Sequence, residues 1–368
     1  MTSNTAKALE KTQLTLGIIA LTDSAPLVIA KHLGLFQHWG LTVDLALQHS
    51  WSTLRDKLQA GLLDGAQMLA PIPLASCTGA NSGNALITAF NLSMNGNGIT
   101  LSKALYREVC QVSDEFEQQT PKLPLTASYL KLAIAKRKQQ GLAKLTFAVV
   151  HPYSCHFYQL RDWLKSADID IDSDIDVMVI APVDMNAALE SGDIDGFCVG
   201  NPWNAKAVRA DIGVTVITSC DIWSQAPEKV LAVSERWQQQ NPNTFLALLA
   251  AVQQACQWLA EPINRFEAAV ILSSSEYLNE ELSVVAPSLL DSCLTERGEP
   301  PRKVVAYNRF ISQEANKPTL TQGYQLLEKM ATAGQLNGEL SQSQQHQIVK
   351  QVYRPDLYIA MQRLLAVS

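Results

Sequence analysis

Short runs of apolar residues alternate with longer stretches in which apolar residues recur every three or four positions. The short runs have the length and composition of buried strands, and the periodic stretches between them have the spacing of helices packed on one face. Apolar strands separated by helices are typical of a parallel sheet covered on both sides, so the pattern predicts an α/β fold. The predicted strands are 14–21, 41–47, 66–69, 85–90, 144–150, 175–180, 197–199, 214–217 and 230–233.

The same local pattern occurs twice along the chain, at residues 64–71 and 195–202. In each copy an Asp-Gly pair precedes a short apolar strand, and a proline follows the strand. We interpret each Asp-Gly as a tight turn and each proline as the start of a helix. The repetition indicates two α/β domains of related build. Each would offer a helix N-terminus to a shared cleft, where amides and the helix dipole favour an anion.

Two segments are candidates for crossings between these domains. Residues 91–98 are rich in Asn and Gly, so they are predicted to form a turn rather than a helix or strand. Residues 226–233 are interpreted as the return crossing. These positions predict domain I as 1–100 plus 228–368 and domain II as 101–227, a two-lobed binding protein with a hinge. The helices expected after residue 241 would cover the outer face of domain I.

Composition narrows the class of ligand and the compartment. The 368 residues carry a net charge of −6, which provides no footprint for nucleic acid or anionic lipid. The basic cluster at 131–138 is interpreted as the solvated face of a helix. The seven cysteines are widely spaced and favour a reducing compartment. Glu10 interrupts the basic region that a signal peptide would need, so we expect a cytoplasmic location.

Catalysis is not expected from the sequence. It has no Gly-x-Ser-x-Gly, no Walker-type phosphate loop, no His-Glu-x-x-His and no Rossmann glycine triplet. Cys155 and His156 are the one nucleophile-like pair, but adjacent residues at a helix start usually point in different directions. No Cys/His spacing predicts a metal site, and no cofactor is expected.

Four segments resemble the nitrate- and bicarbonate-binding family of ABC-transporter solute receptors. They are SWSTLRD at 50–56, LDGAQMLAPIP at 63–73, NGNGIT at 95–100 and CVGNPWN at 198–204. The resemblance implies a type II periplasmic-binding-protein-like fold. Within the family the chain looks most like the NasS-type cytoplasmic nitrate/nitrite sensors. That likeness implies a NasT-type RNA-binding antiterminator as partner. The alternative is a receptor that hands nitrate or bicarbonate to a membrane permease.

Carried over residue by residue, the resemblance implies a nitrate or nitrite pocket made by Trp51, Asn97, His156 and Lys229. Nitrate is a flat, weakly hydrated monovalent anion, so one or two cationic donors and an aromatic wall suffice. The family commonly has glutamine where Asn97 stands, so a direct contact, a water bridge and a changed preference towards nitrite remain open. Asn201 replaces the more usual acidic residue before the Pro-Trp.

Without the resemblance, simpler interpretations compete for three of these residues. Trp51 could pack on the surface, and His156 could serve as a helix cap. Lys229 next to Glu228 would by default form a surface ion pair of little energetic weight.

Overall fold

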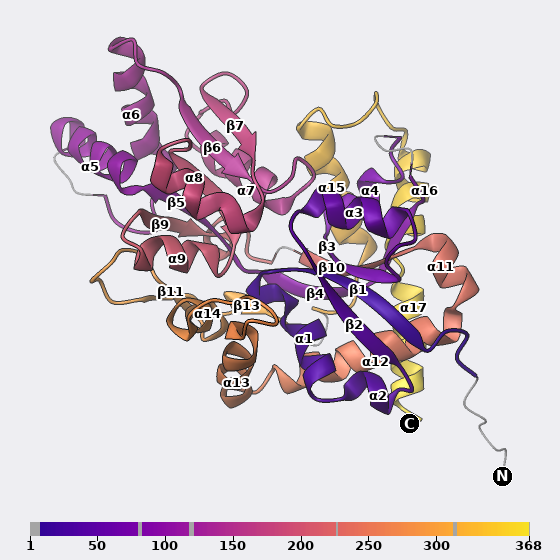
Figure 1. Ribbon diagram of the computed structural model, residues 1–368. Coiled ribbons are helices and arrows are strands. Elements are labelled where there is room, and N and C mark those ends of the chain that lie inside the picture. Colours follow the sequence, from indigo (N-terminus) through magenta and orange to yellow (C-terminus); the bar gives the residue numbers. More distant parts are fainter. Residues whose placement is uncertain (1–7, 80–82, 118–120, 226, 312–314, 368) are drawn as a thin grey trace.

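The computed structural model describes residues 8–79, 83–117, 121–225, 227–311 and 315–367, and it shows two α/β lobes lying side by side (Figure 1). Each lobe is built on its own sheet, with helices on the sheet faces. The α/β two-lobed fold predicted from the sequence is confirmed.

Both sheets combine parallel and antiparallel strands. The first contains β1 (Gln13–Ile19), β2 (Thr42–Gln48), β3 (Gly65–Leu69), β4 (Leu86–Asn95), β10 (Pro227–Ser234) and β13 (Asn308–Arg309), in the order β13-β4-β10-β3-β1-β2. The second contains β5 (Asn97–Ser102), β6 (Leu145–Val149), β7 (Ile175–Val179), β8 (Gly196–Gly200) and β9 (Gly213–Thr218), in the order β7-β6-β8-β5-β9. A separate ribbon pairs β11 (Ser292–Cys293) with β12 (Arg302–Lys303).

The helices fall into three groups along the chain. The first lobe has η1 (Thr22–Ser24), α1 (Ala25–His32), α2 (Leu35–His38), α3 (Trp51–Gln59) and α4 (Pro71–Ala75). The second has α5 (Lys103–Glu117), α6 (Ala127–Gln139), α7 (Cys155–Lys165), η2 (Pro182–Asp184), α8 (Met185–Ser191), α9 (Trp203–Arg209) and α10 (Ser219–Ile222). The C-terminal group is α11 (Glu235–Gln240), α12 (Pro242–Trp258), α13 (Pro262–Ser273), α14 (Leu282–Leu289), α15 (Leu320–Thr332), α16 (Gln342–Val352) and α17 (Pro355–Leu365).

The prediction of wholly parallel sheets is wrong in part. β1 pairs in parallel with β2 and β3, and β6 pairs in parallel with β7 and β8. The two strands that follow the crossings, β10 and β5, are inserted antiparallel beside β3 and β8. They enter their sheets from the opposite lobe, so they run against the strands that each lobe forms from its own βαβ units.

The first crossing is sharper than predicted. Instead of a turn over residues 91–98, β4 continues to Asn95 and β5 begins at Asn97, with Gly96 alone between them. Asn95 and Gly96 have φ values of 64° and 95°, the left-handed region that favours glycine. A Cβ on Gly96 would also lie 2.3 Å from Asn308 Oδ1. The polar composition of this segment reflects its position between the sheets. The division into domains at residues 100 and 227 stays a prediction.

The repeated Asp-Gly pattern corresponds to the same structure in both lobes. The Asp64 carboxylate accepts the backbone N–H of Thr15 at 2.9 Å, and the Asp195 carboxylate accepts that of Thr146 at 2.8 Å. Each aspartate thereby fixes the start of one strand against its parallel neighbour. The glycines do not make the turns that the sequence suggested: both open a strand, Gly65 opposite Leu16 and Gly196 opposite Phe147.

Substituting Gly196 by alanine is expected to destabilise the second lobe by about 1–3 kcal/mol, the usual cost of overpacking a core. Its Cβ would lie 2.7 Å from the Phe147 ring and 3.0 Å from the carbonyl oxygen of Thr100. The matched substitution, Gly65→Ala, brings its Cβ to 3.1 Å from a Leu16 methyl group, which moves more easily than a ring or backbone. Urea unfolding should therefore show a larger loss for Gly196→Ala. Equal losses would contradict this packing argument.

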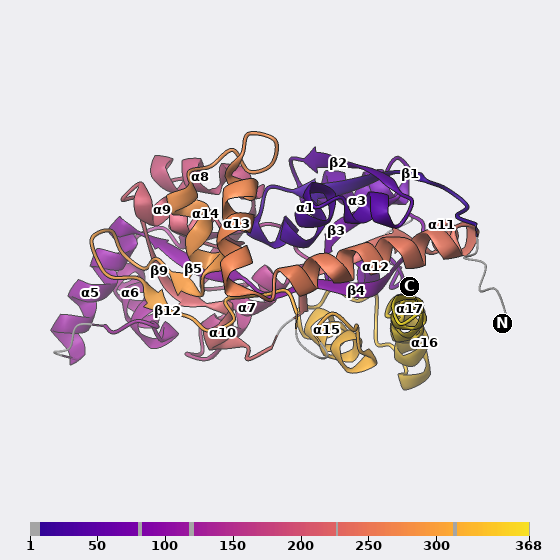
Figure 2. The same cartoon turned by 90° about the horizontal axis from the view of Figure 1, so that it is seen from below.

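The C-terminal helices contact both lobes rather than the first alone. α12 crosses the outside of the first lobe against α1 and α17 (Figure 2). α14, however, packs on α9 of the second lobe, where Val284 joins Ala205 and Val208 in one apolar cluster.

On the second lobe, the basic cluster at 131–138 forms surface ion pairs, such as Lys136 with Glu115 at 2.7 Å, as expected of a solvated helix face. No helix in the described part of the chain is long and apolar enough to cross a membrane.

Candidate functional site

Two serine N-caps start the helices that carry the predicted aromatic and imidazole groups. Ser50 Oγ accepts the N–H of Thr53 at 3.2 Å, and Ser154 Oγ accepts the N–H of Phe157 at 3.1 Å. Trp51 is the first residue of α3, because the Ser50 cap lies one residue before it. His156 lies in the first turn of α7, and both side chains are fully buried. The surface interpretation of Trp51 is wrong.

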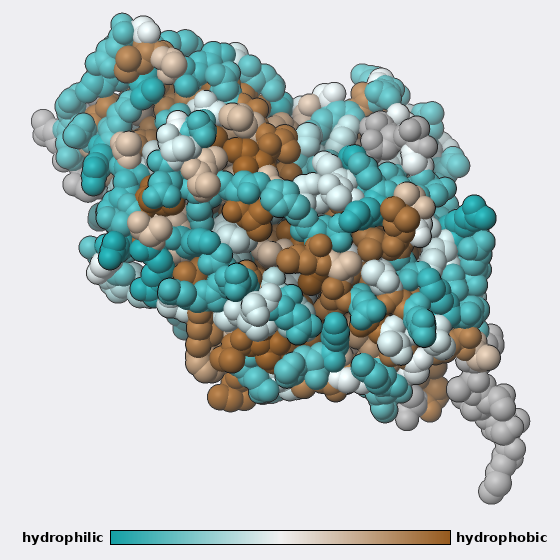
Figure 3. Space-filling model, in the orientation of Figure 1, coloured by the Kyte–Doolittle hydropathy of each residue, from teal (hydrophilic) through white to brown (hydrophobic). Residues whose placement is uncertain are grey.

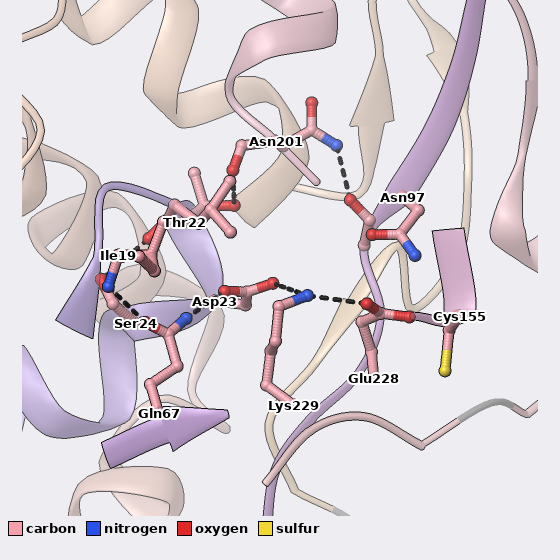
Figure 4. A network of polar contacts seen from close by, with 12 residues as sticks. Ile19, Thr22, Asp23, Ser24, Gln67, Asn97, Cys155, Asn201, Glu228 and Lys229 are labelled. Atoms are coloured by element: carbon pink, nitrogen blue, oxygen red, sulfur yellow. Dashed lines mark hydrogen bonds and ion pairs between the residues drawn. The ribbon is translucent and has the colours of Figure 1, made fainter. Parts of the chain in front are cut away.

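Lys229 lies between two carboxylates in the interior (Figure 4). Its ammonium is 2.7 Å from Glu228 Oε1 and 3.0 Å from Asp23 Oδ2. All three side chains are at most 2% exposed, so the alternative of a surface Glu228–Lys229 pair is wrong. Asp23 reaches this position from η1 of the first lobe, and the other two come from the first residues of β10.

A second donor, the side-chain amide of Gln67, binds the other carboxylate oxygen of Asp23. Gln67 Nε2 donates to Asp23 Oδ1, while Gln67 Oε1 accepts the backbone N–H of Ile19 at 2.9 Å. Because both ends of the Gln67 amide are occupied, the carboxylate of Asp23 is fixed in one orientation towards Lys229. Gln67 belongs to the motif at 63–73, and the network explains why a buried strand contains a polar residue at that point.

Burial and the neighbouring charges shift the pKa values of Asp23, Glu228 and Lys229. Burial raises the pKa of Asp23 and of Glu228, although the nearby ammonium opposes the shift in both. Burial alone would lower the pKa of Lys229, but the two carboxylates outweigh it and the pKa is raised. Lys229 is thus a permanent cation at neutral pH. It lies 5.5 Å from the centre of the Trp51 ring, which forms a wall beside it.

His156 is a neutral imidazole in this surrounding. Burial, and secondarily the charge of Lys229, lower its pKa well below the ordinary value. Its Nε2 is 3.5 Å from Glu228 Oε1, too long for a strong hydrogen bond. The helix-cap interpretation is wrong, since Ser154 and not His156 caps α7.

Asn97 and Gln159 form an amide pair within the second lobe. Asn97 Nδ2 donates to Gln159 Oε1 at 2.9 Å, joining the first residue of β5 to α7. Gln159 lies three residues after His156, so both side chains project from one face of the helix. The pairing leaves Asn97 Oδ1 and Gln159 Nε2 without a partner among the described residues.

Unpartnered polar atoms converge on this point from both lobes. Within the part of the chain that the structure describes, the buried atoms without a hydrogen-bond partner here are Trp51 Nε1, Gln159 Nε2, both His156 ring nitrogens, Asn97 Oδ1 and Glu228 Oε2. Leaving a buried polar group unpaired costs about 1–3 kcal/mol, so native interiors rarely do so. This cluster is the candidate ligand site. No group of side chains suited to a metal ion occurs in the described ranges.

The polar groups of Asn201 are used for contacts within the protein, and the anion contact that the strand-to-helix pattern suggested for its segment stays a prediction. Asn201 Nδ2 donates to the carbonyl of Gly96 at 3.0 Å, and its own carbonyl accepts the N–H of Thr22 at 2.8 Å. Trp203 is buried, as expected of a core residue, and donates its Nε1 to the carbonyl of Ala20 at 3.1 Å. The segment therefore connects the two lobes beside the pocket.

The rim of the cleft is closed by side-chain contacts between the lobes. His49 Nε2 is 2.9 Å from Asp184 Oδ2, and Arg55 lies 3.4 Å from His151 Nε2. Seen from outside, apolar and polar residues alternate on this face, with apolar side chains gathered where the lobes meet (Figure 3). The structure brings Trp51, Asn97, His156 and Lys229 together. The residues that the sequence analysis missed are Gln159, Asp23 and the pocket role of Glu228.

Comparison with known proteins agrees with this architecture. The model of the NMT1-like family matches residues 7–273. The chain is 36% identical over 353 residues to the nitrate import ATP-binding protein NrtC of Synechocystis sp., covering 95% of this chain and 50% of that protein. It is 35% identical over 331 residues to the bicarbonate transport ATP-binding protein CmpC of Synechococcus elongatus, covering 89% and 46%. The chain thus spans about half the length of these relatives.

A solved structure is similar over nearly the whole chain. The periplasmic nitrate-binding protein NrtA from Synechocystis PCC 6803 superposes with a TM-score of 0.88 at 27% identity, covering 98% of this chain and 91% of that one. The resemblance to nitrate- and bicarbonate-binding solute receptors is confirmed. The chain belongs to the NMT1-like family.

Proposed function

We propose that the chain is the anion-binding component of an ABC-type nitrate or bicarbonate transport system, and that its two lobes close over one planar monovalent oxyanion. The observation that carries the proposal is the convergence of the unpartnered donors of Trp51, His156 and Gln159 beside the buried ammonium of Lys229. The donors come from both lobes, so the complete site exists only when the cleft is closed.

The chemistry of the pocket suits a small anion of low charge density. It offers one permanent cation, several neutral donors and an indole wall, whereas phosphate or sulfate would call for more charge. The names of the related proteins support nitrate and bicarbonate as the candidates. Binding rather than catalysis is proposed, because the unpartnered groups include no activated nucleophile: the pKa of the Cys155 thiol is raised well above its usual range by burial and by Glu228.

The sensor hypothesis assigns the same anion pocket to a regulatory protein instead of a transport receptor. A nitrate/nitrite sensor that controls a NasT-type antiterminator from the cytoplasm would use the same pocket, with the ligand shifting the lobes towards the closed form. The relatives named above are transport proteins, which favours the transport role. The sensor role, its partner and the cytoplasmic location therefore stay predictions.

Calorimetric titration with nitrate, nitrite, hydrogencarbonate and sulfate, each in a matched chloride buffer, tests the proposal. We expect dissociation constants on the order of micromolar for nitrate or hydrogencarbonate and no heat from sulfate. The control is Lys206→Ala, which removes an exposed cation paired with Glu280 and should bind like the wild type. Absence of binding by all four anions would remove the proposed function.

A further inference from the structure

Glu228 is an unusual residue to find in an anion site. It is fully buried, and its Oε1 contacts Lys229 at 2.7 Å and faces His156 Nε2 at 3.5 Å. Its Oε2 has no partner among the described residues. An ionised carboxylate with one open oxygen beside the unpartnered donors would repel an incoming anion.

The charges around Glu228 do not cancel without a further proton. The groups that face it are Lys229 on its own strand, Asp23 on η1, Cys155 and His156 on α7, and Cys198 on β8. Burial keeps both thiols protonated, since it raises each thiol pKa well above the usual range, and His156 is neutral. One ammonium therefore faces two carboxylates, so a ligand that has only acceptor atoms meets an excess of negative charge.

Of the two carboxylates, Glu228 is the one that can give up its charge more easily. Asp23 accepts from Gln67 as well as from Lys229, so both of its oxygens have donors. Glu228 Oε2 accepts no hydrogen bond of good geometry, although the Asn97 amide and the Cys155 thiol lie close to this carboxylate. Protonation of Oε2 would create a donor without breaking the Oε1 contact with Lys229.

We propose that Glu228 determines specificity by requiring one proton in the occupied site: it takes a proton from solvent when nitrate binds, and stays ionised when the ligand brings its own proton. This inference rests on the proposed function. Nitrate has only acceptor atoms, so the proton must sit on Glu228 Oε2 and be donated to the anion. Hydrogencarbonate carries a hydroxyl group that donates to the ionised Oε2 instead. In both complexes one hydrogen lies between the carboxyl group and the ligand.

The pH dependence follows from this difference. Burial already raises the pKa of Glu228, and a bound anion raises it further. Between the free-state and bound-state values, nitrate binding takes up one proton, so its affinity should fall by up to about tenfold per pH unit as the pH rises. Below the free-state value the affinity should level off. Hydrogencarbonate should lack this dependence over the same range, since its complex needs no added proton.

Titration of the full chain with nitrate and with hydrogencarbonate, in buffers of different ionisation enthalpy, tests the proposal. Buffer-dependent heats should report uptake of up to one proton per nitrate and none per hydrogencarbonate. Nitrate binding without proton uptake at any pH, or equal uptake with both anions, would overturn the proposal while leaving the proposed function intact. If neither anion binds, the proposed function fails first.

The variant Glu228→Gln tests whether the proton taken up with nitrate binds to Glu228. The amide supplies a permanent donor and no charge. Nitrate should therefore bind the variant without proton uptake, and at high pH more tightly than it binds the wild type. Hydrogencarbonate should bind the variant more weakly than it binds the wild type. Glu280→Gln, which alters a carboxylate paired with Lys206 at the surface, is the matched control and should keep the linkage. Unchanged proton uptake in Glu228→Gln would assign the proton to another group, such as His156, and overturn the proposal. If the variant fails to fold, the wild-type buffer comparison still decides.

Discussion

Replacing Lys229 by alanine is expected to abolish anion binding and to lower the free energy of unfolding by about 3–5 kcal/mol, the usual cost of breaking a buried ion pair from one side. The substitution removes the one cation of the pocket and leaves Asp23 and Glu228 facing each other in the interior. Calorimetry with nitrate and urea unfolding at neutral pH measure the two effects. Because Asp23, Glu228 and Lys229 are all buried, the substitution should affect stability as well as binding.

The stability loss should depend on pH in a defined direction. Burial raises the pKa of both carboxyl groups above their unfolded values, and removal of the ammonium raises them further. A carboxyl group with a raised folded-state pKa destabilises the fold above that pKa, and the penalty disappears as the pH falls through it. The difference between variant and wild type should therefore shrink on acidification.

Lys138→Ala is the matched control for this experiment. Lys138 is 73% exposed and pairs with Asp174 at 3.2 Å, so solvent screens the interaction and its loss should change neither binding nor stability appreciably. Unchanged nitrate affinity in Lys229→Ala would remove that residue from the site. Unchanged stability would contradict the buried triad.

Trp51→Phe is expected to weaken anion binding roughly 10- to 150-fold, the range for a hydrogen bond of about 1.5–3 kcal/mol to a charged group. The phenyl ring keeps an aromatic wall beside Lys229, but the indole N–H is lost. That N–H has no partner among the described residues, so the stability of the free protein should fall only by the packing lost with the smaller buried ring. Titration with nitrate and thermal unfolding without ligand separate the two quantities.

Trp163→Phe is the control, a variant in which stability should change and anion affinity should not. The Nε1 of Trp163 donates to the carbonyl of Leu125 at 3.0 Å inside the second lobe. Loss of this hydrogen bond should lower stability by about 1 kcal/mol beyond the packing cost that both variants share, and anion affinity should stay unchanged. If Trp51→Phe also affected stability and not affinity, Trp51 would be a core residue and not part of the site.

The hydrophobic pattern predicted most strands because each is a short, nearly unbroken apolar run. The repeated Asp-Gly motif predicted the relation between the lobes, since the aspartate before β3 and the aspartate before β8 make the same contact with the neighbouring strand, β1 and β6 respectively. The pattern failed at residues 91–98, where strands continue through polar residues. Asn91 is buried there and donates to the carbonyl of Ala315, far away in the sequence. Local polarity cannot reveal such a partner.

The site was less accessible to sequence reasoning than the fold. Trp51, Asn97, His156 and Lys229 were found through a family resemblance, and residue pattern alone favoured surface or capping roles for three of them. Asp23 contacts Lys229 across more than half of the chain, so no local signal reports the pair. Gln159 offered one clue, its position one helical turn after His156, which places both on the same face of α7.

The position of Gly96 has a mechanical consequence. Asn97 follows it directly, and Glu228 and Lys229 lie on the neighbouring return strand, where Pro227 pairs with Met94. The crossing strands thus lie beside the candidate site, whereas His49 and Asp184 meet at the rim. A rotation of one lobe about the crossing would displace each side chain in proportion to its distance from the crossing. A partner protein that contacts the rim would therefore be sensitive to whether the candidate site is occupied.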